Sequence, residues 1–297
     1  MEDFSLMKLG KNPAVIDDRT IKMASILRLL PSYPEAFDVD SQYPNLKDTH
    51  MFKNDTLGDC VIAGRAHQTL RLENYEQGTV IPISDSDVTT EYFKESGGQD
   101  TGLNMLDALN AWRTGWRAAS NVYNIYAYAS INVLDWNEVR ATCYLLNGIY
   151  IGLQLPISAQ TQSTWDVVSG PNAEPGSWGG HCVYIVAYDN DGLTCMTWGK
   201  RQKMTWQFYQ KYSDESFGIV DNKDSWVAND ALDIAKLENI LNQITGGNIP
   251  PPTPPVPPVP PKKRCIFSGW GKKDKLTNAQ VKTIRTDLSL GITTITF

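Results

Sequence analysis

Apolar residues recur at helical spacing directly after a polar turn at residues 54–59. The stripe that they form lies within an arc of about 100°, as in a helix buried along one face, and its members are Ile62, Ala63, Ala66 and Leu70. The pattern predicts a helix from Cys60 to about Glu76, where Gln77 and Gly78 give a stop signal.

The same spacing predicts further helices near residues 20–30, 103–117, 136–147 and 231–244, and helix-start residues that can cap a helix predict another at 84–94. Apolar runs predict strands at 124–133 and 148–155. Residues 182–188 and 193–198 flank a turn of Asp, Asn and Gly, which predicts an antiparallel hairpin. Closure of this turn near residues 190 and 191 would place His181 opposite residues 197–200. A group that orients His181 should therefore come from that stretch.

The alternation of helices and antiparallel strands predicts an α+β protein with four parts. Residues 1–50 form an arm that wraps the domain, residues 51–247 form the domain, and residues 248–261 form a spacer rich in proline. Residues 262–297 contain a helix candidate at 277–288 and a β-prone tail at 292–297. This last part is too small for a secure core, so we expect a docking or self-association module, or a partly ordered tail.

Composition limits the classes of function. The chain of 297 residues is 41% hydrophobic, which is ample for a sizeable core, and its net charge of −6 gives no broad basic face for nucleic acid. The sequence has no apolar run long enough to span a membrane and no leader-like start, so we expect synthesis and folding in a cytoplasm. Five widely spaced cysteines without a CxxC pair predict neither a disulfide framework nor a zinc site.

Cys60 is the candidate nucleophile because it opens the predicted helix. Backbone N–H groups and the positive end of the helix dipole lower the pKa of a thiol placed there. Thr56 and Asp59 are suitable cap residues, and Gly58 allows a sharp entry turn. A buried structural cysteine explains this stretch equally well.

A histidine that follows Gly179-Gly180 and opens a strand lies 121 residues after Cys60, and this order of residues resembles the papain-like cysteine peptidases. Residues 54–60 resemble the turn before the family's nucleophile, and residues 178–188 resemble the strand that bears its histidine. Residues 196–199 resemble the family's Asn-Ser-Trp-Gly segment. Together with residues 205–217, the likeness extends to a group of papain-like proteins from bacteriophages and bacteria. It covers about residues 8–245.

The resemblance implies a papain-like fold, in which a helical part bearing the nucleophile packs on an antiparallel β part, and it implies a role for several residues. Cys60 would be the nucleophile and His181 its base, while Asn54 would help to bind the oxyanion. Met196 stands where the family has the asparagine that orients the histidine, and a thioether cannot do this. Thr197 or a backbone carbonyl would take that part, and Trp198 would shield the pair from water.

Other residues also bear on the same site. Gly97 and Gly98 are candidates for the backbone edge that pairs with a peptide substrate, with a simple turn as the alternative. His67 lies about 10 Å along the helix from Cys60, too far to be its base, whereas His50 in an extended segment is unconstrained. A charged Asp59 would oppose thiolate formation.

Three functions stay open. The first is a cysteine hydrolase that cleaves a peptide or isopeptide bond through a thioester on Cys60. The second is a non-catalytic papain-like domain that serves as a structural or host-interaction component of a phage particle, with a phage protein or a second copy as partner of residues 262–297. The third is a cell-wall amidase or transglutaminase-like enzyme. None of them implies a metal or an organic cofactor.

Overall fold

The computed structural model describes residues 3–28, 33–43, 45–46, 48–222, 232–244, 283–287 and 292–296. Two compact units divide the chain, Met1–Ile249 and Pro250–Phe297. The first unit combines helices with a mainly antiparallel sheet, and this confirms the α+β class.

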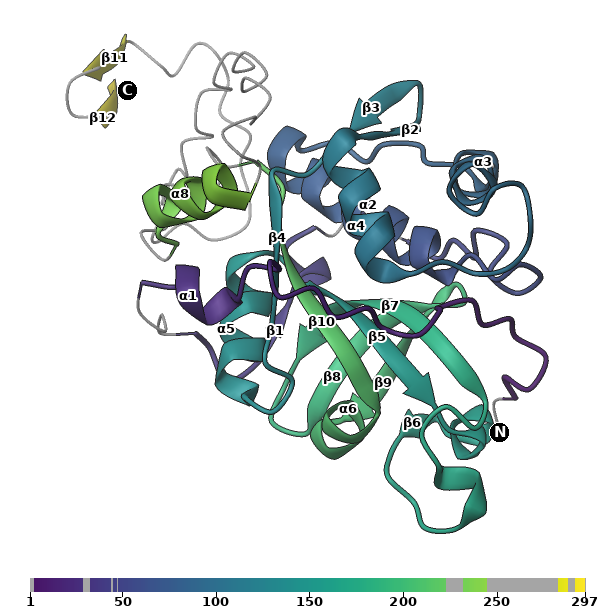
Figure 1. The fold of residues 1–297 in the computed structure, drawn as a ribbon. Coiled ribbons are helices and arrows are strands. Elements are labelled where there is room, and N and C mark those ends of the chain that lie inside the picture. The colour runs from purple at the N-terminus through teal and green to yellow at the C-terminus, as the bar shows by residue number, and fades with distance from the viewer. Residues whose placement is uncertain are drawn as a thin grey trace. The chain divides into compact units, whose positions relative to one another are not determined.

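Three helices, α2 (Cys60–Gln77), α3 (Asp85–Glu95) and α4 (Met105–Thr114), group beside the short hairpin of β2 (Trp116–Ala118) and β3 (Asn121–Tyr123) (Figure 1). Ser84 and Asp87 form a capping box at the start of α3, and the Asn104 side chain caps α4. Every residue from Cys60 to Asn74 is buried, so α2 is the central helix of this part.

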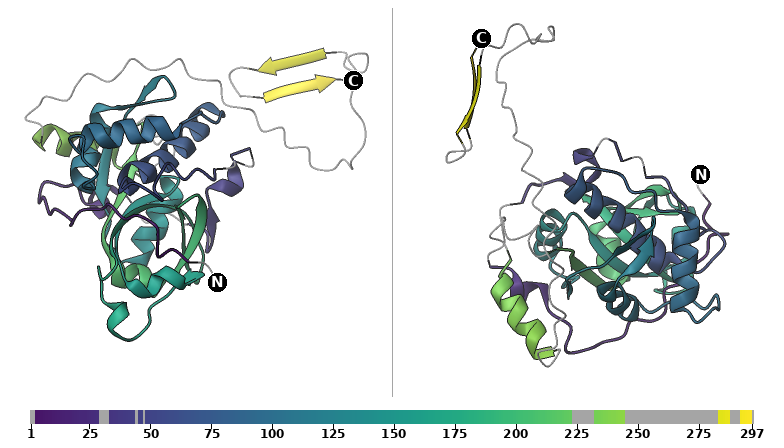
Figure 2. Two further views of the ribbon diagram at one scale, coloured as in Figure 1. Left: turned by 90° about the vertical axis from the view of Figure 1, so that its right-hand side faces the viewer. Right: turned by 90° about the horizontal axis from the view of Figure 1, so that it is seen from above.

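The sheet lies against the helical part and has the order β4-β10-β5-β7-β8-β9-β6, with β1 (Phe37–Asp38) also paired to β7. Its strands are β4 (Ala127–Ser130), β5 (Ile149–Leu155), β6 (Thr164–Trp165), β7 (Gly179–Tyr188), β8 (Gly192–Thr197), β9 (Lys200–Thr205) and β10 (Ser213–Val220). Helices α5 (Trp136–Leu145) and α6 (Trp206–Tyr212) and the 3-10 turns η2 (Ile157–Thr161) and η3 (Pro171–Ala173) connect the strands (Figures 1 and 2).

The hairpin of β7 and β8 has nearly the register that the sequence predicts. Tyr184 pairs with Met196 and Tyr188 with Leu193, so residues at the end of β8 reach the beginning of β7. This pairing carries Thr197 to the part of the sheet that holds His181.

Several predicted elements are shorter than expected. The helix predicted at 20–30 is only α1 (Met23–Ile26), because Lys22 and Leu27 on either side are extended and form bridges to Ser130 and Leu232. The helix predicted at 103–117 ends at Thr114, where Gly115 with φ +101° turns the chain into β2. The strand predicted at 124–133 covers only Ala127–Ser130.

Residues 3–43 are part of the first unit and also contain the 3-10 turn η1 (Asp40–Gln42). Helix α8 (Ile234–Ile244) closes this unit and buries Leu237 and Leu241. None of the helices in the described ranges is long and apolar enough to span a membrane.

In the second unit, β11 (Thr283–Asp287) pairs antiparallel with β12 (Ile292–Thr296). The helix predicted at 277–288 is therefore wrong over residues 283–287. Threonine and isoleucine occupy three of these five positions, and β-branched residues favour strands when a partner strand is available. The β-prone tail is a strand as predicted, whereas the predicted spacer at 248–261 lies outside the described residues.

Candidate active site

Cys60 occupies the first position of α2, and its sulfur lies against strand β7. The backbone N–H of Cys182 donates a hydrogen bond to Cys60 Sγ at 3.4 Å. Cys182 directly follows His181, so the packing of α2 on β7 brings the predicted nucleophile to the strand that carries the predicted base.

His181 is fully buried and is held on two sides by the last residue of β8 and the residue after it. Its Nε2 lies 2.7 Å from Thr197 Oγ1, and the ring of Trp198 stacks on the imidazole with centroids 4.4 Å apart. When Nε2 carries the proton, the Thr197 hydroxyl accepts it in a hydrogen bond and Nδ1 keeps a lone pair for acid–base chemistry.

Met196 occupies a different environment from Thr197. It packs with Val39, Tyr184 and Val186 in a small separate apolar cluster. Adjacent residues of a strand point to opposite faces, so only one of the two neighbours can reach the imidazole. Here it is Thr197, one position after the place where the resemblance expects an asparagine.

Trp198 closes the site with an aromatic cluster. Its ring contacts Phe4, Trp165 and Trp178 at centroid distances of 5.1, 6.1 and 5.5 Å. The backbone of Trp198 has φ +45°, an unfavourable conformation for a bulky residue. This conformation holds the indole over His181 and keeps water from the imidazole.

Asn54 and Cys60 line the same cavity of about 10 Å³, together with Thr197 and Trp198. This space is close to the minimum that one water molecule needs. The Asn54 amide is buried, and its Nδ2 donates to the carbonyl of Leu57 at 3.3 Å. In this conformation the amide of Asn54, the predicted oxyanion donor, is therefore occupied by a hydrogen bond within the turn at residues 54–57.

Residues 4–12, which we name the N-terminal strap, run across the site between the helical part and the sheet. The Lys11 N–H donates to the carbonyl of Gly180 at 3.0 Å, next to His181. On the other side, the Leu103 N–H donates to the Gly10 carbonyl and the Asn12 N–H donates to the Leu103 carbonyl, both at 2.8 Å. The strap thus forms backbone hydrogen bonds with both walls of the site.

Glycines on both sides allow this close approach. A Cβ on Gly10 would lie 1.8 Å from the Gly58 carbonyl oxygen, and a Cβ on Gly180 would lie 2.1 Å from the Lys11 carbonyl oxygen. Gly58 is thus positioned against the strap, and its N–H donates to Asp100 at 2.9 Å. The sequence offered only a turn as the reason for this glycine.

The backbone edge beside Cys60 is Gly102–Leu103, whereas the sequence pointed to Gly97–Gly98. Gly97 and Gly98 have φ +70° and +83°, and the space around a Cβ at either position is open. They form the turn after α3. Gly102 contacts the strap so closely that a Cβ there would meet the Gly10 carbonyl oxygen at 2.3 Å.

Burial changes the ionisation of the predicted pair. Burial raises the pKa of the Cys60 thiol to about 12, although the backbone N–H groups of Cys182 and Gly10 act against it, and burial lowers the pKa of His181 to about 3. The expected lowering of the Cys60 pKa is therefore wrong for this closed conformation. Thiol and imidazole are both neutral, and His181 Nδ1 is buried without a hydrogen-bond partner among the described residues.

Asp59 does not oppose thiolate formation as expected. It precedes α2, but its side chain makes no cap hydrogen bond, and both carboxylate oxygens are buried near the Asn54 amide, which only partly offsets the cost of burial. Burial raises the pKa of Asp59 from its ordinary value of 3.8 to about 8. The group is therefore mainly neutral at pH 7.

The other two histidines belong to a structural ion network. His67 Nδ1 lies 2.5 Å from Asp48 Oδ2, and Arg71 Nη1 donates to the same oxygen at 2.7 Å. Burial opposes ionisation of Asp48, yet His67 and Arg71 hold its pKa well below the usual value. His50 Nδ1 lies 3.2 Å from the second oxygen of Asp48. The sequence gave no signal for this central role of Asp48.

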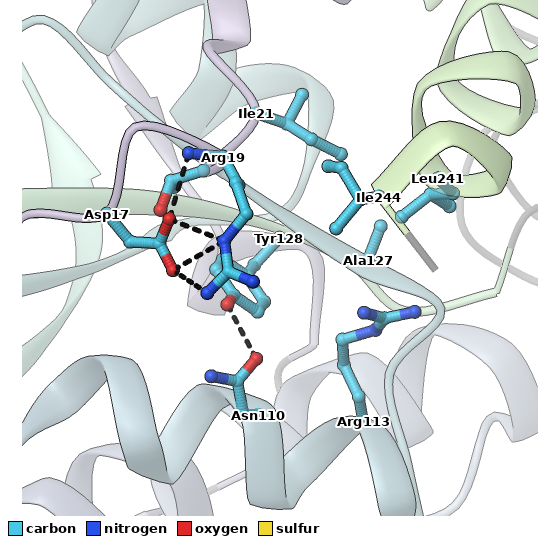
Figure 3. Close-up of a pocket in the computed structure, with 10 residues that line it drawn as sticks. Asp17, Arg19, Ile21, Asn110, Arg113, Ala127, Tyr128, Leu241 and Ile244 are labelled. Carbon is cyan, nitrogen blue, oxygen red and sulfur yellow. Dashed lines mark hydrogen bonds and ion pairs between the residues drawn. The ribbon is translucent and has the colours of Figure 1, made fainter. Parts of the chain in front are cut away.

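Two further sites hold none of the predicted catalytic residues. Glu73, Glu76 and Asp221 have ligand atoms within 4.8 Å of one another and could hold a metal ion, at the end of α2 away from Cys60. A pocket of about 160 Å³ lies between α4, β4 and α8, with an Asp17–Arg19 ion pair and a Tyr128–Asn110 hydrogen bond at its wall (Figure 3).

The chain is similar to known proteins in its three-dimensional structure and not detectably in its sequence. No protein-family profile and no curated protein matches this chain. Xylellain, a cysteine protease from Xylella fastidiosa, superposes with a TM-score of 0.57 at 15% identity, over 75% of this chain and 98% of that one. A proCathepsin B from Trypanosoma congolense superposes with a TM-score of 0.54 at 11% identity, over 73% of this chain and 87% of that one.

A ragweed pollen cysteine protease in its proform gives a TM-score of 0.51 at 13% identity, over 69% of this chain and 71% of that one. These neighbours share the arrangement of a helical part on an antiparallel sheet at low sequence identity. The first unit of the chain therefore has the papain-like fold of the cysteine proteases.

Proposed function

We propose that this protein is a cysteine hydrolase that cleaves peptide or isopeptide bonds and that the strap keeps it latent. The observation that carries the proposal is the convergence of Cys60, at the start of α2, on the strand that presents His181 and its partner Thr197. A buried structural cysteine has no need of an oriented imidazole on the facing strand.

The chemistry follows from the arrangement once the strap has left. His181 Nδ1 takes the Cys60 proton, and Sγ attacks the substrate carbonyl carbon. The oxyanion is stabilised by the Cys60 N–H and by Asn54 after its amide leaves Leu57. Collapse expels the amine, which takes the proton from His181 and leaves a thioester on Cys60. Water, deprotonated by His181, then releases the acid and restores the thiol.

Latency follows from the position of the strap. It fills the site from wall to wall, and the buried thiol and imidazole are both neutral. Two of the similar structures are of a proCathepsin B and of a protease in its proform, which supports a resting state with a covered site. Gly102–Leu103 is our candidate for the edge that binds substrate after release.

The test uses the full-length protein and the substitution Gly10→Ala, whose Cβ cannot fit against Gly58. We expect the variant to cleave labelled casein at least about tenfold faster than the wild type, which requires only about 1.4 kcal/mol in favour of the open state. The double variant Gly10→Ala/Cys60→Ala is the control and should not cleave. A folded Gly10→Ala protein without cleavage activity would refute the proposal.

One observation favours the alternative of a non-catalytic domain. Cys60 is only 1% exposed and His181 is fully buried, so the resting protein presents no reactive site. Virion association and partners of residues 262–297 belong to this second proposal. Product analysis separates hydrolysis from acyl transfer, because only acyl transfer would join an added amine to the substrate.

A further inference from the structure

The side chain of Lys11 is buried in an acidic pocket beside the proposed catalytic pair. Its ammonium lies 2.8 Å from Asp214 Oδ2 and 2.9 Å from Glu215 Oε1, and it also donates to the Asn12 carbonyl at 3.2 Å. The Lys11 side chain has no exposed surface. The ammonium therefore makes two hydrogen bonds, to Asp214 and to the Asn12 carbonyl, and a further ion pair with Glu215.

Neighbouring strands of the sheet build the pocket. Glu215 in β10 pairs with Gly152 in β5, and a Cβ on Gly152 would lie only 2.1 Å from Lys11 Cε. The missing side chain of Gly152 is what makes room for the lysine stem. Gln154, also in β5, donates to Asp214 at 2.7 Å and fixes that carboxylate. Its walls are strands β5 and β10 of the central sheet and do not belong to the strap.

The strap residues that fill and precede the pocket contact residues close in sequence to the reacting groups. Gly10 packs on Gly58, two positions before Cys60, whereas the Lys11 N–H bonds the carbonyl of Gly180, next to His181. A peptide that crosses the site along the path of the strap would therefore direct one side chain into the same pocket.

Departure of the strap would leave a buried carboxylate without its cation. The Glu215 side chain is 7% exposed, and its oxygens have no hydrogen-bond partner among the described residues apart from the ion pair with Lys11. Burial raises the pKa of Glu215 even with Lys11 beside it. An unpaired buried carboxylate is unfavourable, and a second cation in the same place relieves the cost.

We propose that Gly152, Asp214 and Glu215 form a specificity subsite for a lysine-like side chain of the substrate, and that Lys11 occupies it in the resting protein as a stand-in for that side chain. This inference rests on the proposed function and adds the class of substrate. A groove of about 520 Å³ includes Asp214 and Glu215 and is also lined by Asp17, Glu138 and Lys22, so its acidic side chains outnumber its basic one.

The test uses full-length Gly10→Ala protein and peptidyl vinyl sulfones that alkylate the nucleophile. Matched probes carry lysine or norleucine at each of the three positions before the electrophile, because norleucine keeps the carbon chain and lacks the ammonium. At one position we expect the lysine probe to label Cys60 about tenfold faster or more, the scale of one charge-assisted hydrogen bond. Adding Glu215→Gln should bring the ratio close to one.

Two controls separate the possible failures. Glu215→Gln also removes the ion pair that holds Lys11, so iodoacetamide reactivity of Cys60 is measured on each protein and the two probes are compared within each protein. Asp214→Asn, at a more exposed position, should reduce the probe ratio if Glu215→Gln fails to fold. Equal labelling by lysine and norleucine probes at all positions, with labelling dependent on His181, would overturn the subsite and leave the proposed function intact. Loss of all His181-dependent labelling would overturn both.

Discussion

At the scale of single residues, the site depends on which side chain holds the imidazole. The resemblance to papain-like peptidases placed Met196 at the orienting position, but Met196 packs into a separate apolar cluster. Thr197 lies 2.7 Å from His181 Nε2 and has the hydroxyl oxygen that the bond requires. Replacement of the usual amide by a neighbouring hydroxyl therefore keeps the imidazole oriented.

Thr197→Val tests this role, because valine has the shape of threonine without the hydroxyl. In the Gly10→Ala background we expect casein cleavage to fall by about 10- to 100-fold, the loss found when the hydrogen-bond partner of a metal-binding histidine is removed. The pH profile of Cys60 alkylation should also lose its His181-dependent part. Thr197→Ser should retain most of both signals, and an unchanged profile in Thr197→Val would contradict the assignment.

At the level of secondary-structure elements, the start of α2 places the predicted nucleophile Cys60 directly after Asp59, a buried carboxyl group that is costly to ionise. Asp59 is fully buried at the N-cap position of α2, but its side chain does not accept a hydrogen bond from the first turn. It therefore contributes little to the stability of this helix. The folded protein holds its proton up to a pH of about 8, whereas the unfolded chain releases it near 3.8. Stability is then lost as pH rises from about 4 to 8, because the unfolded state ionises first.

Asp59→Asn should therefore stabilise the fold by an amount that grows with pH. The gain should be smallest at pH 4, rise by up to about 1.4 kcal/mol for each pH unit and level off above about pH 8. Chemical denaturation of wild type and variant at several pH values measures the difference. A difference that does not vary with pH would show that Asp59 does not hold its proton in the folded state.

At the scale of the whole molecule, the sequence predicted the parts whose signals are local. The α2 stripe, the capping signals of α3 and the turn after Tyr188 gave elements with nearly correct bounds, and hairpin register placed Thr197 within reach of His181. The strap depends instead on close approach between distant glycines, which leaves no periodic pattern. For the same reason, the ionisation of Cys60 could not be foreseen from its place on a helix.

The proposed function requires that Cys60 and His181 become an activated pair once the strap leaves the site. Site-mapped alkylation by iodoacetamide between pH 4 and 8 tests it most directly, on wild type, Gly10→Ala and Gly10→Ala/His181→Ala. We expect slow labelling of Cys60 in the wild type, where burial holds the pKa of the thiol at about 12.

In Gly10→Ala, Cys60 should react selectively even below pH 6, as a thiolate paired with an imidazolium does, and this advantage should disappear with His181→Ala. If the open variant reacts like an ordinary thiol, or if its reactivity is the same without His181, the account of this site is contradicted.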